Sequence, residues 1–122
     1  MKNRIDACFE KLKAENKKAL VTFITAGDPD MDTTEKCVLE MYKNGSDIIE
    51  IGVPFSDPIA EGATIQKASL RSLSGGTNLD KIFDLVRKLR TQTNKPMLLM
   101  MYINTISVSY THLRAHETLR HL

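Results

Sequence analysis

The sequence predicts an α/β fold built on a parallel β-sheet. Three apolar segments, residues 19–27, 47–53 and 97–103, have the composition of strands, and amphipathic helical segments separate them. This alternation is typical of right-handed βαβ units, and near-continuous apolar strands fit a sheet that is covered on both faces. Three strands are too few to close a barrel, whose eight-strand form usually needs about 200 residues or more. The sequence therefore encodes either a small open sheet or part of a larger fold.

The chain begins with a predicted helix, for which Asn3 is the expected N-cap. Its apolar face consists of Ile5, Cys8, Phe9 and Leu12. The first strand, residues 19–27, ends at Gly27 and the turn-forming pair Asp28 and Pro29. The next helix is expected to start at Asp32, which stands in capping-box spacing with Glu35, and to stop at Asn44 and Gly45. Its apolar side consists of Val38, Met41 and Tyr42.

The second strand, residues 47–53, leads into a long loop, residues 54–63. A helix from about residue 64 to 73 is expected to end at the two glycines that follow it. Another is expected to begin at Thr77, spaced from Asp80 as in a capping box. Its apolar face consists of Ile82, Phe83, Val86 and Leu89. The third strand follows Lys95 and Pro96.

Composition narrows the class of protein. Of the 122 residues 42% are apolar, and 17 basic side chains stand against 15 acidic ones, so that neither nucleic acid nor an acidic membrane surface is an expected partner. No signal peptide and no window of about 18 apolar residues is present, so we expect a cytoplasmic protein. Cys8 and Cys37 stand singly among apolar helical neighbours and are expected to be small buried hydrophobes.

Glu50 is an ionisable residue in the middle of an apolar strand. Burying a carboxylate without a partner costs free energy. Glu50 is therefore either a structural residue that pairs with a lysine or with backbone amides, or part of a functional site. Ligands of α/β folds bind at the carboxyl ends of the strands, and Glu50 lies a few residues before that end. The loop beyond it adds Asp57 and Glu61, and loops in this position are more often functional than decorative. Glu50 is therefore a candidate general acid–base, and Asp57 and Glu61 are both candidates for a second acid beside it.

The run IIEIGVPFSDPIAEGATIQKAS resembles the signature of the tryptophan synthase alpha chain family. The resemblance extends from about Arg4 to Ile106 and includes FITAGDPD, SGGTN and LLMMYIN. It implies a (β/α)₈ TIM barrel, of which residues 1–106 would be the N-terminal part, with about three parallel strands, an extra N-terminal helix and the remaining strands truncated.

The resemblance also implies a function in tryptophan biosynthesis. That family is a lyase that cleaves indole-3-glycerol phosphate to indole and glyceraldehyde 3-phosphate, a retro-aldol reaction without metal or cofactor. Glu50 would be the general acid–base that protonates the indole C3 carbon, and Glu61 would bind the indole N–H. Phe23 and Tyr102 match positions that line the substrate pocket. Glu61 stands where aspartate is usual, and Ala63 where proline is usual.

The same resemblance implies a partner. Phe55, Asp57 and Pro58 match the part of the loop that faces the beta chain, which holds pyridoxal phosphate in an alpha2-beta2 complex. A well-capped loop without partner contact is the alternative for these residues. Thr25 and Asp28, at the mouth of the first strand, are weaker candidates for positioning the substrate.

The last residues, 107–122, continue neither the strand and helix pattern nor the family resemblance of the residues before them. His112 and His116 lie four apart, but His121 is spaced one residue too far for HExxH, and no third metal ligand is in context. Residues 108–118, VSYTHLRAHET, instead resemble a translated sequencing adapter, so we expect a non-native tail on a truncated gene. A fragment with open sheet edges is expected to expose apolar surface and to lack activity.

Two other functions remain open on the sequence alone. One is a different phosphosugar TIM-barrel lyase with another acid–base pair. The other is a non-catalytic module that keeps the loop to bind a beta subunit.

Overall fold

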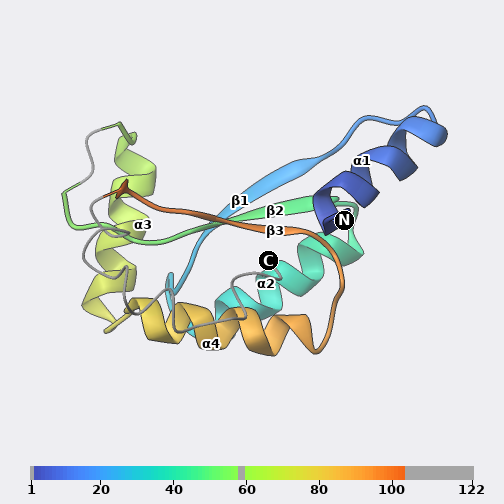
Figure 1. Ribbon diagram of the computed structural model, residues 1–122. Helices are drawn as coiled ribbons and strands as arrows, with labels where there is room; N and C mark the ends of the chain where they lie inside the picture. Colours follow the sequence, from blue (N-terminus) through green and yellow to red (C-terminus); the bar gives the residue numbers. More distant parts are fainter. Residues whose placement is uncertain (1, 58–59, 104–122) are drawn as a thin grey trace.

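The computed structural model describes residues 2–57 and 60–103 (Figure 1). The elements in chain order are α1 (Arg4–Ala14), β1 (Val21–Thr25), α2 (Met31–Lys43), β2 (Ile48–Gly52), α3 (Ala63–Ser74), α4 (Leu79–Arg90) and β3 (Met97–Met100). The strands form one parallel sheet in the order β1-β2-β3, as the sequence predicts. The predictions for His112, His116, His121 and the tail 107–122 lie outside the described residues.

Helices α2 and α4 cover one face of this sheet (Figure 1). The core between them and the sheet includes Val38 and Tyr42 of α2, Ile49 and Ile51 of β2, and Met97 of β3. Among the described helices α4 buries the most large apolar side chains: Ile82, Phe83, Leu85, Val86 and Leu89. Because burial of apolar area is the main source of folding free energy, this layer holds the fold together.

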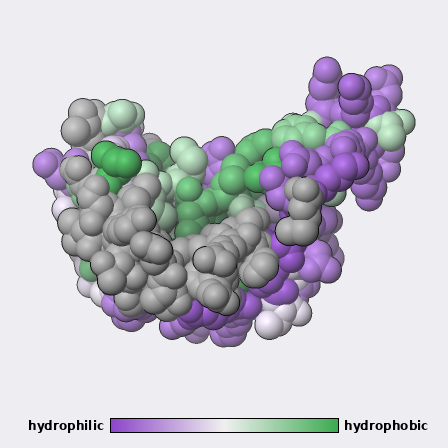
Figure 2. All heavy atoms as spheres, in the orientation of Figure 1, coloured by the Kyte–Doolittle hydropathy of each residue, from purple (hydrophilic) through white to green (hydrophobic). Residues whose placement is uncertain are grey.

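Much of the opposite face of the sheet is exposed in the part of the chain that the structure describes. Large apolar side chains remain exposed there or at its margin: Leu20, Val21, Phe23, Leu98 and Met100. Figure 2 shows apolar surface along the hollow between the two ends of the molecule. The expected exposure of apolar surface is therefore confirmed.

Two helix starts differ from the prediction. Asn3 caps α1 as expected, but α2 is capped by Asp30 and not by Asp32, and α4 by Asn78 and not by Thr77. In each case the capping side chain accepts from the backbone N–H three residues on, and its own backbone is extended. Spacing in the sequence allowed either start, and backbone conformation decided between them.

The strands are shorter than predicted at one or both ends, and two side chains predicted to be buried are exposed. Phe9 is 49% exposed, because α1 buries only Leu12. Cys37 is exposed, because α2 buries Thr34, Val38 and Tyr42 and successive helical residues point about 100° apart. In the part of the chain that the structure describes, no helix combines the length and the apolar character needed to cross a membrane.

Candidate active site

Glu50 lies on the open face of the sheet. It is in register with Phe23 of β1 and Leu98 of β3, and paired residues of parallel strands point to the same side. Phe23 is 39% exposed and Glu50 is half-buried. The carboxylate therefore lies in an apolar row that faces away from the α2 and α4 layer.

An apolar pocket of about 280 Å³ opens at the carboxyl ends of the three strands. Its lining combines residues from the three strands, the segments after β2 and β3, the loop before α3, and α3 itself: Phe23, Thr25, Gly52, Val53, Ala60, Glu61, Ile65, Ser69, Met100, Met101 and Tyr102. Three of the four predicted catalytic and substrate-binding residues, Phe23, Glu61 and Tyr102, thus meet at one pocket. Glu50 does not line it, but it lies two residues before Gly52 on the same face of β2.

Glu61 places a carboxylate at this pocket. Its Oε2 atom is buried and has no hydrogen-bond partner among the described residues. Its main-chain carbonyl accepts a hydrogen bond from Nε2 of Gln66 (2.7 Å), and Gly62, the next residue, is the N-cap of α3. Gly62 has no side chain that could accept from the first amides of α3. A buried acceptor oxygen without a partner is suited to take an N–H from a ligand.

Phe55 and Tyr102 stack, with ring centroids 4.7 Å apart and planes inclined by 28°. The stack joins the loop after β2 to the segment after β3, so a predicted partner-interface residue touches a predicted substrate-binding residue. Asp57 is exposed, and Pro58 lies outside the described residues. Phe55, in contrast, is half-buried against the pocket wall.

Gly52 is a site residue that we did not single out from the sequence. A Cβ atom at this position would lie 2.5 Å from Cζ of Phe23 and 2.8 Å from Cε2, so only glycine lets this ring lie over β2. The available signal was a glycine at the end of an apolar strand, which often marks close approach of another group. Thr25, a weaker candidate from the sequence, lines the pocket and is buried, whereas Asp28 is not among the lining residues.

A larger groove of about 750 Å³ lies at the other end of the sheet, beside α1. It is lined by basic, acidic and apolar side chains, among them Lys18, Asp47 and Leu20, and by none of the predicted site residues. Within the described ranges no group of three histidine, cysteine, aspartate or glutamate residues could hold a metal ion. We therefore assign the candidate site to the smaller pocket, where the predicted residues meet.

An apolar pocket at the carboxyl ends of parallel strands, on a sheet with helices on its other face, is the arrangement of a (β/α)₈-barrel site. The protein-family model for the tryptophan synthase alpha chain matches residues 9–116. The chain therefore belongs to the tryptophan synthase alpha chain family. Its structure corresponds to the N-terminal part of the barrel, as predicted.

Relatives and solved structures agree with this assignment. The alpha chain of Geotalea uraniireducens is 57% identical over 104 residues, which are 85% of this chain and 39% of the relative, and that of Clostridium kluyveri is 51% identical. The alpha subunit from Legionella pneumophila str. Paris superposes with a TM-score of 0.91 at 40% identity, over 98% of this chain and 46% of that one. A tryptophan synthase a2b2 complex from Pyrococcus furiosus gives a TM-score of 0.71 at 40% identity, over 75% of this chain and 38% of that one. The chain thus spans about two-fifths of the length of the curated relatives it matches.

Proposed function

We propose that the chain is the N-terminal part of a protein that carries out the alpha reaction of tryptophan biosynthesis, the cleavage of indole-3-glycerol phosphate to indole and glyceraldehyde 3-phosphate. The observation that carries the proposal is the meeting of Phe23, Glu61 and Tyr102 from three separate segments in one apolar pocket, with Glu50 on the same sheet face. Membership of the tryptophan synthase alpha chain family supports it.

In the proposed reaction two carboxylates divide the proton transfers. Glu50 delivers a proton to the indole C3 carbon, and the bond from C3 to the glycerol chain then breaks. Glu61 takes the proton from the indole nitrogen and returns it as the carbon–carbon bond breaks. The hydroxyl of the glycerol chain gives its proton to the Glu50 carboxylate, which the first transfer left ionised, and becomes the aldehyde. One proton arrives at carbon as another leaves, so two carboxylates in different surroundings suit the two tasks.

The pocket is suited to hold a flat, largely apolar ring. Phe23 and Tyr102 provide aromatic walls, and such faces pack well against a planar ring. The buried Oε2 of Glu61 offers the single acceptor that an indole N–H requires. This chemistry needs neither a metal nor a cofactor in this chain.

We further propose a beta chain as the partner, in an alpha2-beta2 complex whose pyridoxal phosphate belongs to the beta chain. The Pyrococcus furiosus neighbour is itself a tryptophan synthase a2b2 complex, which supports this proposal. Asp57 is exposed on the loop expected to face the partner, with Pro58 as a further predicted contact. Phe55 would pass a change in this loop to Tyr102 through their stacked rings.

This chain by itself is proposed to be inactive. It spans 39% of the length of its Geotalea uraniireducens relative, and among the described residues Glu50 lies on a sheet face where large apolar side chains remain exposed. Exclusion of water strengthens the electrostatic interactions that such a reaction needs. The cytoplasmic location, the boundary at residue 106 and the origin of the tail stay predictions.

A chimera tests the assignment of residues. Residues 4–106 of this chain replace the matching segment of the Geotalea uraniireducens alpha chain, and indole release is measured. The chimera is expected to release indole, and Glu50→Gln to lower the rate by about 10²–10⁴-fold, the usual contribution of general acid–base catalysis. Glu40→Gln, an exposed change on α2, is the matched control and should leave the rate unchanged.

Indole release that survives Glu50→Gln would refute the catalytic assignment. A chimera that stimulates a beta chain but releases no indole would favour the non-catalytic binding module. The unfused chain, assayed beside it, is expected to give no indole.

A further inference from the structure

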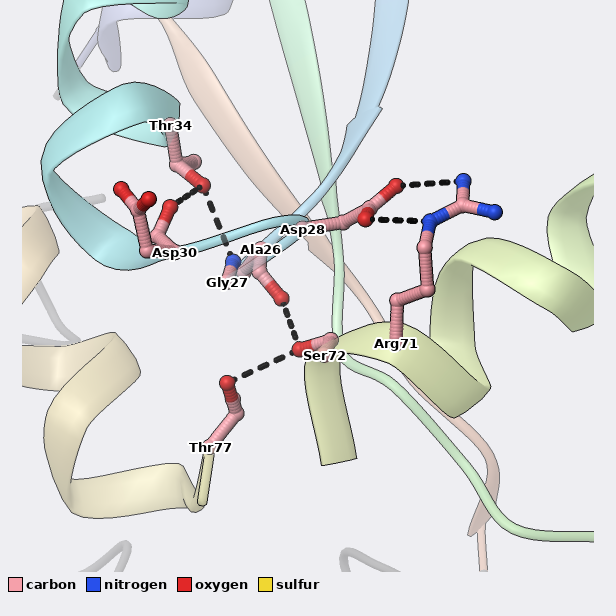
Figure 3. Close-up of polar contacts among 8 residues, drawn as sticks. All are labelled: Ala26, Gly27, Asp28, Asp30, Thr34, Arg71, Ser72 and Thr77. Carbon is pink, nitrogen blue, oxygen red and sulfur yellow. Dashed lines mark hydrogen bonds and ion pairs between the residues drawn. The ribbon is translucent and has the colours of Figure 1, made fainter. Parts of the chain in front are cut away.

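The turn after β1 bridges two helices (Figure 3). On one side, the hydroxyl of Thr34 in α2 accepts from the backbone N–H of Gly27 (2.9 Å) and donates to the carbonyl of Asp30 (2.9 Å). Thr34 is fully buried, so these bonds are shielded from water. The turn is thereby fixed to the α2 side of the molecule.

Helix α3 holds the other side of the same turn. Nε and Nη2 of Arg71 donate to the two carboxylate oxygens of Asp28 at 2.8 and 3.0 Å, and this pairing raises the pKa of Arg71. The hydroxyl of Ser72 donates to the carbonyl of Ala26 (2.5 Å) and lies 2.9 Å from Oγ1 of Thr77. A two-pronged arginine–carboxylate pair fixes direction as well as distance.

These polar contacts matter because α3 has little apolar surface to hold it. Its buried residues are Ala68, Ser69 and Ser72, whereas α4 buries five large apolar side chains. Since stabilisation scales with the apolar area removed from water, two serines and an alanine hold a helix weakly. The orientation of α3 therefore depends on its bonded carboxyl end.

The other end of α3 carries the pocket carboxylate. The helix begins at Ala63, two residues after Glu61, and eight residues of helix separate Ala63 from Arg71, which is about 12 Å at about 1.5 Å per residue. A tilt of about 10° over that length moves the amino end by about 2 Å, and about 1 Å of misplacement can cost about 100-fold in rate.

We propose that the Asp28–Arg71 ion pair, together with the Ser72 hydroxyl on the Ala26 carbonyl, is a clamp that positions Glu61 by fixing the orientation of α3. The clamp acts at a distance: it touches neither Glu61 nor the pocket wall at Phe23. Its importance for catalysis rests on the role proposed for Glu61, but the orientation itself is measurable in this chain without any activity.

The test removes the ion pair and follows both ends of α3 in the full chain. Asp28→Asn keeps the shape of the side chain and removes its charge, and Arg71→Lys keeps the charge but not the two-pronged geometry. Asp84→Asn is the matched control, because Asp84 also pairs with an arginine, Arg87, but on the exposed side of α4. Hydrogen exchange is measured at the amides of α3 and α4, and carbodiimide labelling of Glu61 is measured by mass spectrometry against the exposed Asp32.

In Asp28→Asn we expect exchange at residues 65–69 and labelling of Glu61 to rise about three- to tenfold, with α4 amides and Asp32 unchanged. Arg71→Lys should give a smaller rise in exchange and labelling than Asp28→Asn, because it keeps the charge. Asp84→Asn should give no rise. Unchanged labelling of Glu61 would overturn the proposal, and so would an equal rise in α3 and α4, since that is what a purely stabilising contact produces. Loss of indole release in the chimera bears on the proposed function alone, so the two proposals can fail separately.

Discussion

Gly27→Ala should destabilise the fold much more than an ordinary glycine substitution. Gly27 has φ +81°, and a Cβ atom there would lie 2.1 Å from Oγ1 of Thr77 and 2.6 Å from Oγ of Ser72. Gly45 offers a matched control, because its φ is +118° and a Cβ atom would meet nothing within 4 Å. Both changes strain the backbone, but only the first displaces hydroxyls, those of buried Ser72 and half-buried Thr77.

The expected magnitude follows from these two parts. A non-glycine residue in the left-handed region costs about 1–2 kcal/mol, and this part is shared by Gly27→Ala and Gly45→Ala. Displacing the Ser72 hydroxyl from the Ala26 carbonyl removes a buried hydrogen bond, which costs about 1–3 kcal/mol, and crowding adds about 1 kcal/mol or more. Gly27→Ala should therefore lower the free energy of unfolding by about 2–4 kcal/mol more than Gly45→Ala.

Urea unfolding followed by circular dichroism measures the difference between the two variants. Adding Thr77→Ala to Gly27→Ala removes the nearest atom and should recover part of the loss, because the two sites are coupled. Equal losses in Gly27→Ala and Gly45→Ala would refute the reasoning, since they would mean that the hydroxyls move aside without cost.

Two further predictions concern the core and the pocket. Burial raises the pKa of Tyr42 to about 12, and its hydroxyl donates to the carbonyl of Pro96, so the folded state favours the protonated phenol. Below about pH 10, the pKa of Tyr42 in the unfolded chain, the free energy of unfolding should not depend on the titration of Tyr42. As the pH rises from there to about 12, it should fall by up to about 2–3 kcal/mol. Tyr42→Phe should remove this part of the pH dependence in urea titrations. Gly52→Ala should push the Phe23 ring out of the pocket and lower kcat/KM of the chimera by roughly tenfold or more. The unfolding free energy should change by less than about 1 kcal/mol, because the ring is partly exposed and can turn outward; unchanged kinetics would show that the ring does not shape the pocket.

The order and type of every described element could be predicted from the sequence, because the apolar periodicity of α4 and the near-continuous apolar strands are strong local signals. Helix starts were less certain: Asp30 and Asp32 both offer a carboxylate near the start of α2, and only the extended backbone of Asp30 decides. The exposure of Phe9 and Cys37 depends on which elements cover each helix, which local pattern does not specify.

The site was predictable in part. Side chains alternate along a strand, so the sequence is sufficient to place Glu50 on the face away from Ile49 and Ile51. The meeting of Glu61 with Phe23 and Tyr102 at one pocket depended on family resemblance, because the three residues come from distant segments. The Asp28–Arg71 pair spans 43 residues and leaves no periodic signal at all.

Glu61 is positioned through contacts with one segment that precedes it in the chain and with another that follows it. Glu61 is bound through its carbonyl to Gln66 on α3, so it moves with that helix, whose far end is attached to the turn after β1. Earlier in the same loop, Phe55 stacks on Tyr102 after β3. The geometry around Glu61 therefore depends on β1 and β3 together. A change confined to β1 or to β3 should therefore alter the position of Glu61, although the other acid, Glu50, lies on β2.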